Sequence, residues 1–189
     1  MGEIALFPLN TVLFPGGALP LRIFETRYID MVSRCMKQGS GFGVCLIQEG
    51  QETGKAKMHR VGTLAAVDDW SRGEDGLLHI LAKGRQRFRV QSSRTQKDGL
   101  NLGEVQMLPD DPLLPVPEAQ KQLPDILRQV LLQLQAEQDE VNYADAGWVG
   151  NRLAEVLPIS LPQRQYLLEA EPLKRLEILQ TLVQSLTVN

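Results

Sequence analysis

Four prolines lie within the nine residues from Pro109 to Pro117, and they divide the chain into two parts. Proline lacks a backbone N–H and has a fixed φ, so this stretch cannot continue a sheet or the interior of a helix. The composition changes across it, because 14 of the 16 glycines lie in residues 1–103 and 15 of the 30 leucines lie in residues 116–189. We therefore expect two domains, residues 1–115 and residues 116–189.

The first part consists of short apolar runs separated by turn residues. Pro15 and Gly16 are the residue types of a type II turn, and most later runs end at Gly, Asp or Lys. Runs spaced at roughly ten residues are typical of a small antiparallel barrel or sandwich. From Tyr28 to Met36 the apolar residues recur at intervals of three and four, which predicts one short helix ending at Gly39. Strands are expected at residues 4–9, 12–14, 18–24, 42–47, 61–67, 77–82, 85–91 and 100–107.

The second part follows the helical period. The apolar residues between Leu123 and Leu134 fall on one stripe, which predicts a long amphipathic helix. A second helix is expected from Trp148 to Leu157. Ser160 and Gln163 have the spacing of a capping box that begins a third helix, and Pro172 begins a fourth. The predicted fold class is α+β, a small antiparallel β-barrel or sandwich with one short internal helix, followed by a C-terminal helical bundle.

Charge and hydropathy exclude several classes of protein. The net charge is -3, with +1 in residues 1–115 and -4 in the remainder, so neither part binds nucleic acid or a membrane surface through bulk positive charge. No uncharged apolar run approaches the ~18 residues of a membrane-spanning helix. The first residues, Met1-Gly2-Glu3-Ile4, lack the basic region of a signal peptide. We expect a cytoplasmic protein that does not contact a membrane.

The sequence contains no recognisable catalytic motif. A complete P-loop, a GxSxG elbow and an HExxH helix are all missing. Cys35 and Cys45 form no CxxC pair, and two histidines are too few for a Cys/His metal cluster. The adjacent carboxylates at 68–69, 74–75 and 110–111 are expected to be solvated loop charges. The sequence therefore predicts no enzyme activity, no cofactor and no metal.

One basic segment leaves two interpretations open. Lys83, Arg85, Arg87 and Arg89 alternate with other residues, so in a strand all four cations would lie on one face, about 6.6 Å apart. That face could be a solvated surface that pairs with the acidic helical part. Alternatively, it could follow a single-stranded nucleic-acid backbone, although no ladder of aromatic residues accompanies it for base stacking.

Several segments, in order and spacing, resemble the N-terminal domain of the Lon proteases. The two longest are Phe7–Gly16 (FPLNTVLFPG) and Leu19–Tyr28 (LPLRIFETRY). The similarity covers nearly the whole chain, and it continues at Gly43–Ile47, Val61–Ala65, Asp75–Leu77, Gly84–Val90 and Leu161–Leu176. The resemblance implies a PUA-like pseudo-barrel followed by a helical subdomain. It also implies a role in recognising unfolded or tagged protein substrates.

The 189 residues contain no counterpart of the ATPase and Ser/Lys peptidase modules of those proteases. We therefore expect a stand-alone, non-enzymatic domain that binds segments of other proteins, in concert with a separate ATPase or protease. An apolar surface on the helical part would also permit a homodimer.

The expected peptide-binding residues lie in the front loops. An apolar contact surface with a few orienting polar groups suits an unfolded segment. The barrel core is the alternative place for each apolar candidate, and RNA binding through Lys83, Arg85, Arg87 and Arg89 is the alternative function. The peptide-binding candidates are Phe14, Leu19, Leu21, Arg22, Phe24, Glu25 and Tyr28.

Overall fold

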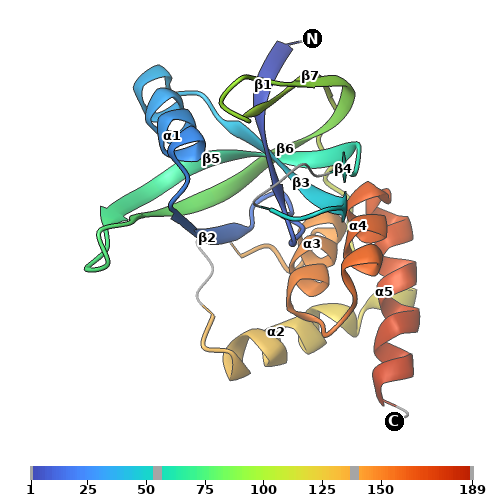
Figure 1. The fold of residues 1–189 in the computed structure, drawn as a ribbon. Helices are drawn as coiled ribbons and strands as arrows, with labels where there is room; N and C mark the ends of the chain where they lie inside the picture. Colours follow the sequence, from blue (N-terminus) through green and yellow to red (C-terminus); the bar gives the residue numbers. More distant parts are fainter. Residues whose placement is uncertain (1, 53–56, 137–140, 188–189) are drawn as a thin grey trace. The chain divides into compact units, whose positions relative to one another are not determined.

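The computed structural model describes residues 2–52, 57–136 and 141–187. It divides into two compact units, residues 1–110 and residues 111–189. The segment 111–115, which the sequence assigned to the first domain, belongs to the second unit. The first unit is built on a β-sheet and the second on helices (Figure 1), so the predicted α+β fold class is confirmed.

Five strands of the first unit close into a barrel. The order β1-β7-β6-β5-β3 returns to β1, because β1 also pairs with β3. Four of these pairings are antiparallel and the closing β1–β3 pairing is parallel, a detail that the sequence did not predict. The strands are β1 (Gly2–Leu9), β2 (Ala18–Ile23), β3 (Phe42–Glu49), β4 (Lys57–Met58), β5 (Val61–Arg72), β6 (Leu78–Thr95) and β7 (Asn101–Met107).

Strand β6 is longer than predicted because Gly84 does not interrupt it. We expected two separate strands, one before and one after this glycine, whereas β6 is continuous for 18 residues. The Gly84 N–H donates to the Gly17 carbonyl, and the Gly16 N–H donates to the Gly84 carbonyl. A Cβ atom at Gly84 would collide with the Phe14 carbonyl oxygen, so glycine is required here for close approach. The expected strand at 12–14 is wrong, since these residues form a buried loop against Gly84.

Helix α1 (Thr26–Gln38) supplies one side of the larger apolar core of the barrel unit. Its buried residues Tyr28, Met31 and Val32 pack with residues of β1, β3, β5 and β6. The Tyr28 ring stacks on Phe7, with their centroids 3.9 Å apart. The helix ends at Gly39 in the left-handed conformation, with φ 61°, so the predicted C-cap is confirmed.

Gly62 tests how tightly the barrel is packed. A Cβ at this position would collide with the Val44 carbonyl oxygen and lie 2.9 Å from the Phe88 ring. We expect Gly62→Ala to lower the free energy of unfolding by about 1–3 kcal/mol, because backbone or core side chains must shift. Urea unfolding measures the change. Gly2→Ala, where nothing lies within 4 Å of the new Cβ, is the matched control and should be neutral. An equal loss in both variants would contradict the close packing.

The helical unit confirms the four expected helices. Its elements are a short 3-10 helix (Glu118–Gln120), α2 (Leu123–Gln133), α3 (Ala146–Val156), α4 (Leu161–Glu169) and α5 (Pro172–Thr187). The predicted capping box is present, since the side chains of Ser160 and Gln163 each accept a hydrogen bond from the other residue's backbone N–H. Leu127, Leu153 and Leu176 are fully buried in its core. Leu134, predicted on the buried stripe, is exposed because α2 ends one residue earlier.

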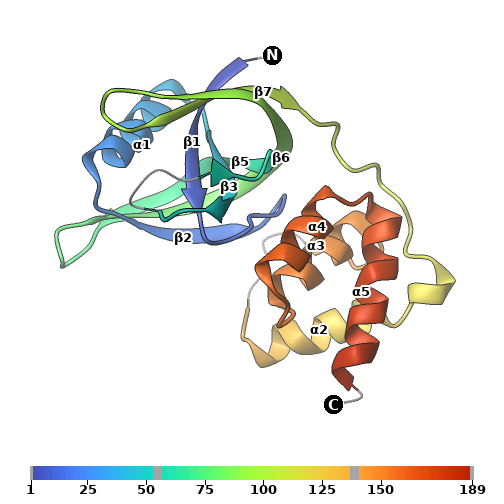
Figure 2. The ribbon, with the colours of Figure 1, turned by 45° about the vertical axis from the view of Figure 1, so that its right-hand side comes forward.

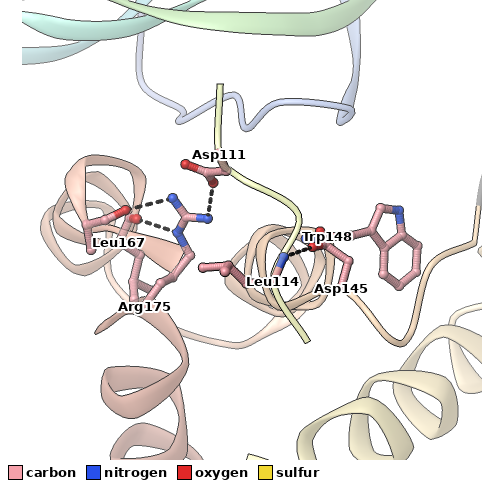
Figure 3. A network of polar contacts seen from close by, with 7 residues as sticks. Asp111, Leu114, Asp145, Trp148, Leu167 and Arg175 are labelled. Atoms are coloured by element: carbon pink, nitrogen blue, oxygen red, sulfur yellow. Dashed lines mark hydrogen bonds and ion pairs between the residues drawn. The ribbon is translucent and has the colours of Figure 1, made fainter. Parts of the chain in front are cut away.

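A buried arginine joins the proline-rich segment to the helices (Figure 3). Arg175, fully buried on α5, lies 2.9 Å from Asp111 and donates to the Leu167 and Ala170 carbonyls, each at 2.8 Å. These bonds add side-chain donors to carbonyl groups at the C-terminal end of α4, where the regular pattern of helix hydrogen bonds ends. Asp111 is therefore part of a buried ion pair, and its interpretation as a solvated loop charge is wrong.

Asp145 holds the same segment a few residues further on. Its side chain accepts hydrogen bonds from the backbone N–H groups of Trp148, at 2.8 Å, and Leu114, at 3.1 Å (Figure 3). The first contact caps α3 and the second fixes the incoming chain. One carboxylate thus connects the start of a helix to the segment that precedes the bundle.

Removing Arg175 should destabilise the helical unit strongly. Arg175→Met breaks the buried ion pair with Asp111 and removes the donors to the Leu167 and Ala170 carbonyls, and we expect a loss of about 3–5 kcal/mol in the free energy of unfolding. The control is Lys174→Met, because Lys174 is exposed and pairs only with Glu177 one turn away. That variant should change stability by less than about 0.5 kcal/mol. Chemical unfolding followed by circular dichroism compares the two, and similar losses would exclude a special role for the buried pair.

Candidate functional site

A surface cavity of about 300 Å³ lies beside strand β2 in the barrel unit. Its lining includes five of the residues predicted to bind peptide, namely Leu21, Arg22, Phe24, Glu25 and Tyr28. They come from one short segment, because β2 leads through two residues into α1. The other lining residues are Phe7, Leu9, Pro20, Ile23 and Glu52. The structure thus gathers most of the sequence-predicted residues around one concavity.

The aromatic residues of this cavity differ in exposure. Tyr28 and Phe7 are buried and stacked on each other, so they form a rigid apolar surface. Burial also raises the pKa of the Tyr28 hydroxyl, against the opposing effect of Arg27. Phe24 is 60% exposed. A large apolar side chain at the edge of an apolar cavity is available to a ligand without any rearrangement of the core.

Two predicted residues do not line the cavity. Phe14 is fully buried in the loop that packs against Gly84, so for this residue the core alternative holds. Leu19 is half-buried and packs against the larger apolar core of the barrel unit. Both positions precede the part of β2 that reaches the cavity.

Most charges around the cavity are already paired. Arg22 contacts Asp75 at 2.6 Å, and Glu25 contacts Arg27 at 2.8 Å. The backbone N–H of Leu77 donates to Asp75 and, together with His79 and Arg22, holds the pKa of that carboxyl below its usual value. Glu52 accepts a hydrogen bond from the backbone N–H of Asn10 at 2.6 Å. Glu52 therefore contributes to the lining a carboxylate that is oriented by a backbone N–H.

The basic segment does not form the predicted stripe. The pairing of β5 with β6 shifts register between Thr63, opposite Arg87, and Ala65, opposite Gly84. This bulge breaks the alternation on which the prediction of one shared face depended. Arg85 and Arg89 are exposed, Lys83 is half-buried and Arg87 is only 6% exposed. The four cations therefore do not lie together on one solvated face.

Metal-binding groups and reactive thiols are other sources of chemistry in a protein of this composition. The described residues contain no group of three His, Cys, Asp or Glu side chains placed to hold a metal ion. Burial raises the pKa of the Cys35 thiol and brings that of Cys45 to about 12, so neither is an activated nucleophile. Asp68 and Asp69 lie in β5 rather than in the expected loop. No helix in the described ranges is long and apolar enough to cross a bilayer.

Glu155 on α3 is a titratable group that the sequence did not single out. Burial raises its pKa to about 7, although Arg152 and Arg164 act in the opposite direction. Arg152 donates to it at 2.8 Å. The unfolded chain would ionise this carboxyl near pH 4.5, so the folded state binds more protons between about pH 4.5 and 7. Stability contributed by the neutral carboxyl is therefore lost as pH rises through this range.

We expect Glu155→Gln to remove part of this pH dependence. As pH rises from about 4.5 to 7, the free energy of unfolding of the wild type should decrease relative to that of the variant, by an amount on the order of 1–3 kcal/mol. Urea unfolding at several pH values measures this difference. Glu177→Gln, which neutralises an exposed carboxylate, should leave the pH profile unchanged. A constant difference between wild type and Glu155→Gln across the range would refute the elevated pKa.

The comparisons with known proteins agree with this architecture. Residues 3–185 match the family described as the ATP-dependent protease La (LON) substrate-binding domain. The chain belongs to this family, as the sequence resemblance indicated. Membership supports a protein-binding role, since the domain binds substrates and is not the catalytic part of the protease.

Individual relatives show how far the similarity extends. A crystal structure of a Lon N-terminal domain protein from Xanthomonas campestris is 39% identical, with a TM-score of 0.83 over 96% of this chain and 98% of the other. The N-terminal domain of a Mycobacterium avium complex Lon protease shares the fold at 15% identity, with a TM-score of 0.64 and coverage of 94% and 96%. Cereblon from Danio rerio is 35% identical over 56% of this chain and 25% of its own length. The chain thus spans about a quarter of that relative.

Proposed function

We propose that this protein binds exposed, non-native segments of other proteins in the cavity formed by residues 20–28, β1 and Glu52. The observation that carries the proposal is the cavity itself, with its buried Phe7–Tyr28 stack and the exposed Phe24. An unfolded segment differs from a folded surface chiefly in the large apolar side chains that it exposes. A concave apolar site with an aromatic anchor recognises that difference.

A role in binding rather than in catalysis agrees with the state of the two cysteine side chains. Both thiols are protonated at neutral pH, because burial raises their pKa values. In this proposal the protein acts in the cytoplasm as a recognition module and delivers captured segments to a separate ATPase or protease. The RNA alternative receives no support from the geometry, because the bulge in the β5–β6 pairing interrupts the alternation between Gly84 and Arg87, and Arg87 is buried.

Phe24→Ala tests the proposal directly. The probe is an array of overlapping, fluorescently labelled peptides that covers the sequence of a permanently unfolded protein. For the peptides that bind, we expect the variant to raise Kd by about 5- to 30-fold, because an aromatic anchor contributes about 1–2 kcal/mol. Fluorescence anisotropy measures Kd, and thermal unfolding verifies that the variant is folded.

Tyr166→Ala is the matched control. Tyr166 is also aromatic and is 61% exposed, but it lies on α4 in the helical unit. Its removal should leave Kd unchanged. The proposal fails if no peptide shows saturable binding, or if the two variants weaken binding equally.

A further inference from the structure

Strand β2 has a free edge. Within the described part of the chain, β2 pairs with β6 and with no other strand. Figure 2 shows β2 at the margin of the barrel unit. Its residues Ala18, Pro20 and Arg22 are exposed. An unpaired edge of this kind offers backbone donors and acceptors to an added strand.

The register shows which backbone groups point outward. Because the Gly84 N–H donates to the Gly17 carbonyl, Gly17 faces β6. In an antiparallel pair successive residues alternate between facing the partner strand and facing away. Ala18, Pro20 and Arg22 therefore direct their backbone groups to the free edge. The position of Pro20 agrees with this assignment, since proline has no N–H to give to β6.

The cavity meets β2 along this edge. Its lining includes Pro20 and Arg22, on one face of the strand, and Leu21 and Ile23, on the other face. Successive side chains point to opposite faces of a strand, so a concavity that touches both sets lies against the edge rather than against one face. A segment that pairs with the edge would therefore place its side chains over the cavity.

We propose that this protein captures extended segments as an added antiparallel strand on the free edge of β2. This inference rests on the proposed function and specifies how the ligand is recognised. Phe24 and the Tyr28 ring receive a large apolar side chain of the segment. Glu52, whose carboxylate lines the cavity and is oriented by the Asn10 N–H, attracts a neighbouring lysine or arginine of the segment.

The edge is suited to reversible capture. Pro20 removes one outward donor, so the described part of β2 directs to its edge the N–H groups of Ala18 and Arg22 and the carbonyl oxygens of Ala18, Pro20 and Arg22. Proline and arginine on an edge strand also oppose uncontrolled pairing between copies of a protein. Backbone pairing would supply affinity that does not depend on sequence, and the cavity would supply selectivity.

The test uses an end-capped octapeptide, Ser-Val-Lys-Phe-Thr-Val-Thr-Ser, and two N-methylated versions of it. One version carries methyl groups on the second, fourth and sixth residues, and the other on the third, fifth and seventh. An added strand directs alternate N–H groups toward β2, so one version should bind at least about tenfold more weakly. The other should bind within about threefold of the parent, because its methyl groups face solvent.

Three protein variants provide an independent measurement. Ala18→Pro removes an outward N–H and should weaken binding of the parent octapeptide by about five- to tenfold. Ala18→Ser keeps that N–H and should bind like the wild type.

Glu52→Gln tests the charge contact. It should weaken binding of the parent octapeptide but not binding of a version with glutamine in place of lysine. Circular dichroism verifies that each variant is folded. If Ala18→Pro does not fold, the N-methylated peptides still test the strand pairing with the wild-type protein.

The outcomes separate this inference from the proposed function. If both N-methylated peptides bind like the parent while Phe24→Ala still weakens binding, the added strand is wrong and the binding cavity stands. Binding of array peptides at Phe24 without binding of the octapeptide also overturns the added strand. If neither the octapeptide nor any array peptide binds, both the inference and the proposed function fail.

Discussion

The close approach of the 14–17 loop to Gly84 determines where the candidate site forms. Strand β6 continues through Gly84 only because no side chain blocks the Phe14 carbonyl oxygen there. The two hydrogen bonds at this point fix which residues of the following strand face β6. They therefore also determine which residues of β2 face the free edge and the cavity. The contact of the 14–17 loop with Gly84, in the longest strand, thus sets the geometry of the residues that follow it.

The site is local in sequence even though the fold that supports it is not. Residues 20–28 provide most of the cavity lining, because β2 turns directly into α1. Their positions nevertheless depend on β6, with which β2 pairs, and on Phe7, against which Tyr28 stacks. Phe24 lies outside the larger apolar core of the barrel unit. The core is complete without it, so this side chain remains available to a ligand.

Features determined by neighbours in the chain could be predicted from the sequence. The Gly39 C-cap, the Ser160 capping box and the amphipathic face of α2 each depend on residues within one or two helical turns. The two-part architecture followed from prolines and composition in the same way. The sequence singled out five of the residues that line the cavity because they lie in a segment that resembles a known family, and their role in binding stays a prediction.

Features determined by distant partners could not be predicted. Gly84 appeared to end a strand, because its contact with the 14–17 loop is long-range. Asp111 was predicted to be a solvated charge, because its partner Arg175 lies 64 positions away in the sequence. The basic stripe failed because a bulge is set by the pairing of β5 with β6 and leaves no mark in a simple alternation.

Net charge gives little information about the chemistry of this cavity. The molecule carries -3 overall and the barrel part is close to neutral, yet local pairing decides which charge a ligand meets. Arg22 and Glu25 are each neutralised by a partner within 3 Å, Asp75 and Arg27 respectively. Glu52 is held by a backbone N–H, which orients its carboxylate without cancelling the charge. In the proposed complex this one oriented carboxylate would favour segments that carry a basic residue, and the acidic composition of the whole chain does not indicate where such a group lies.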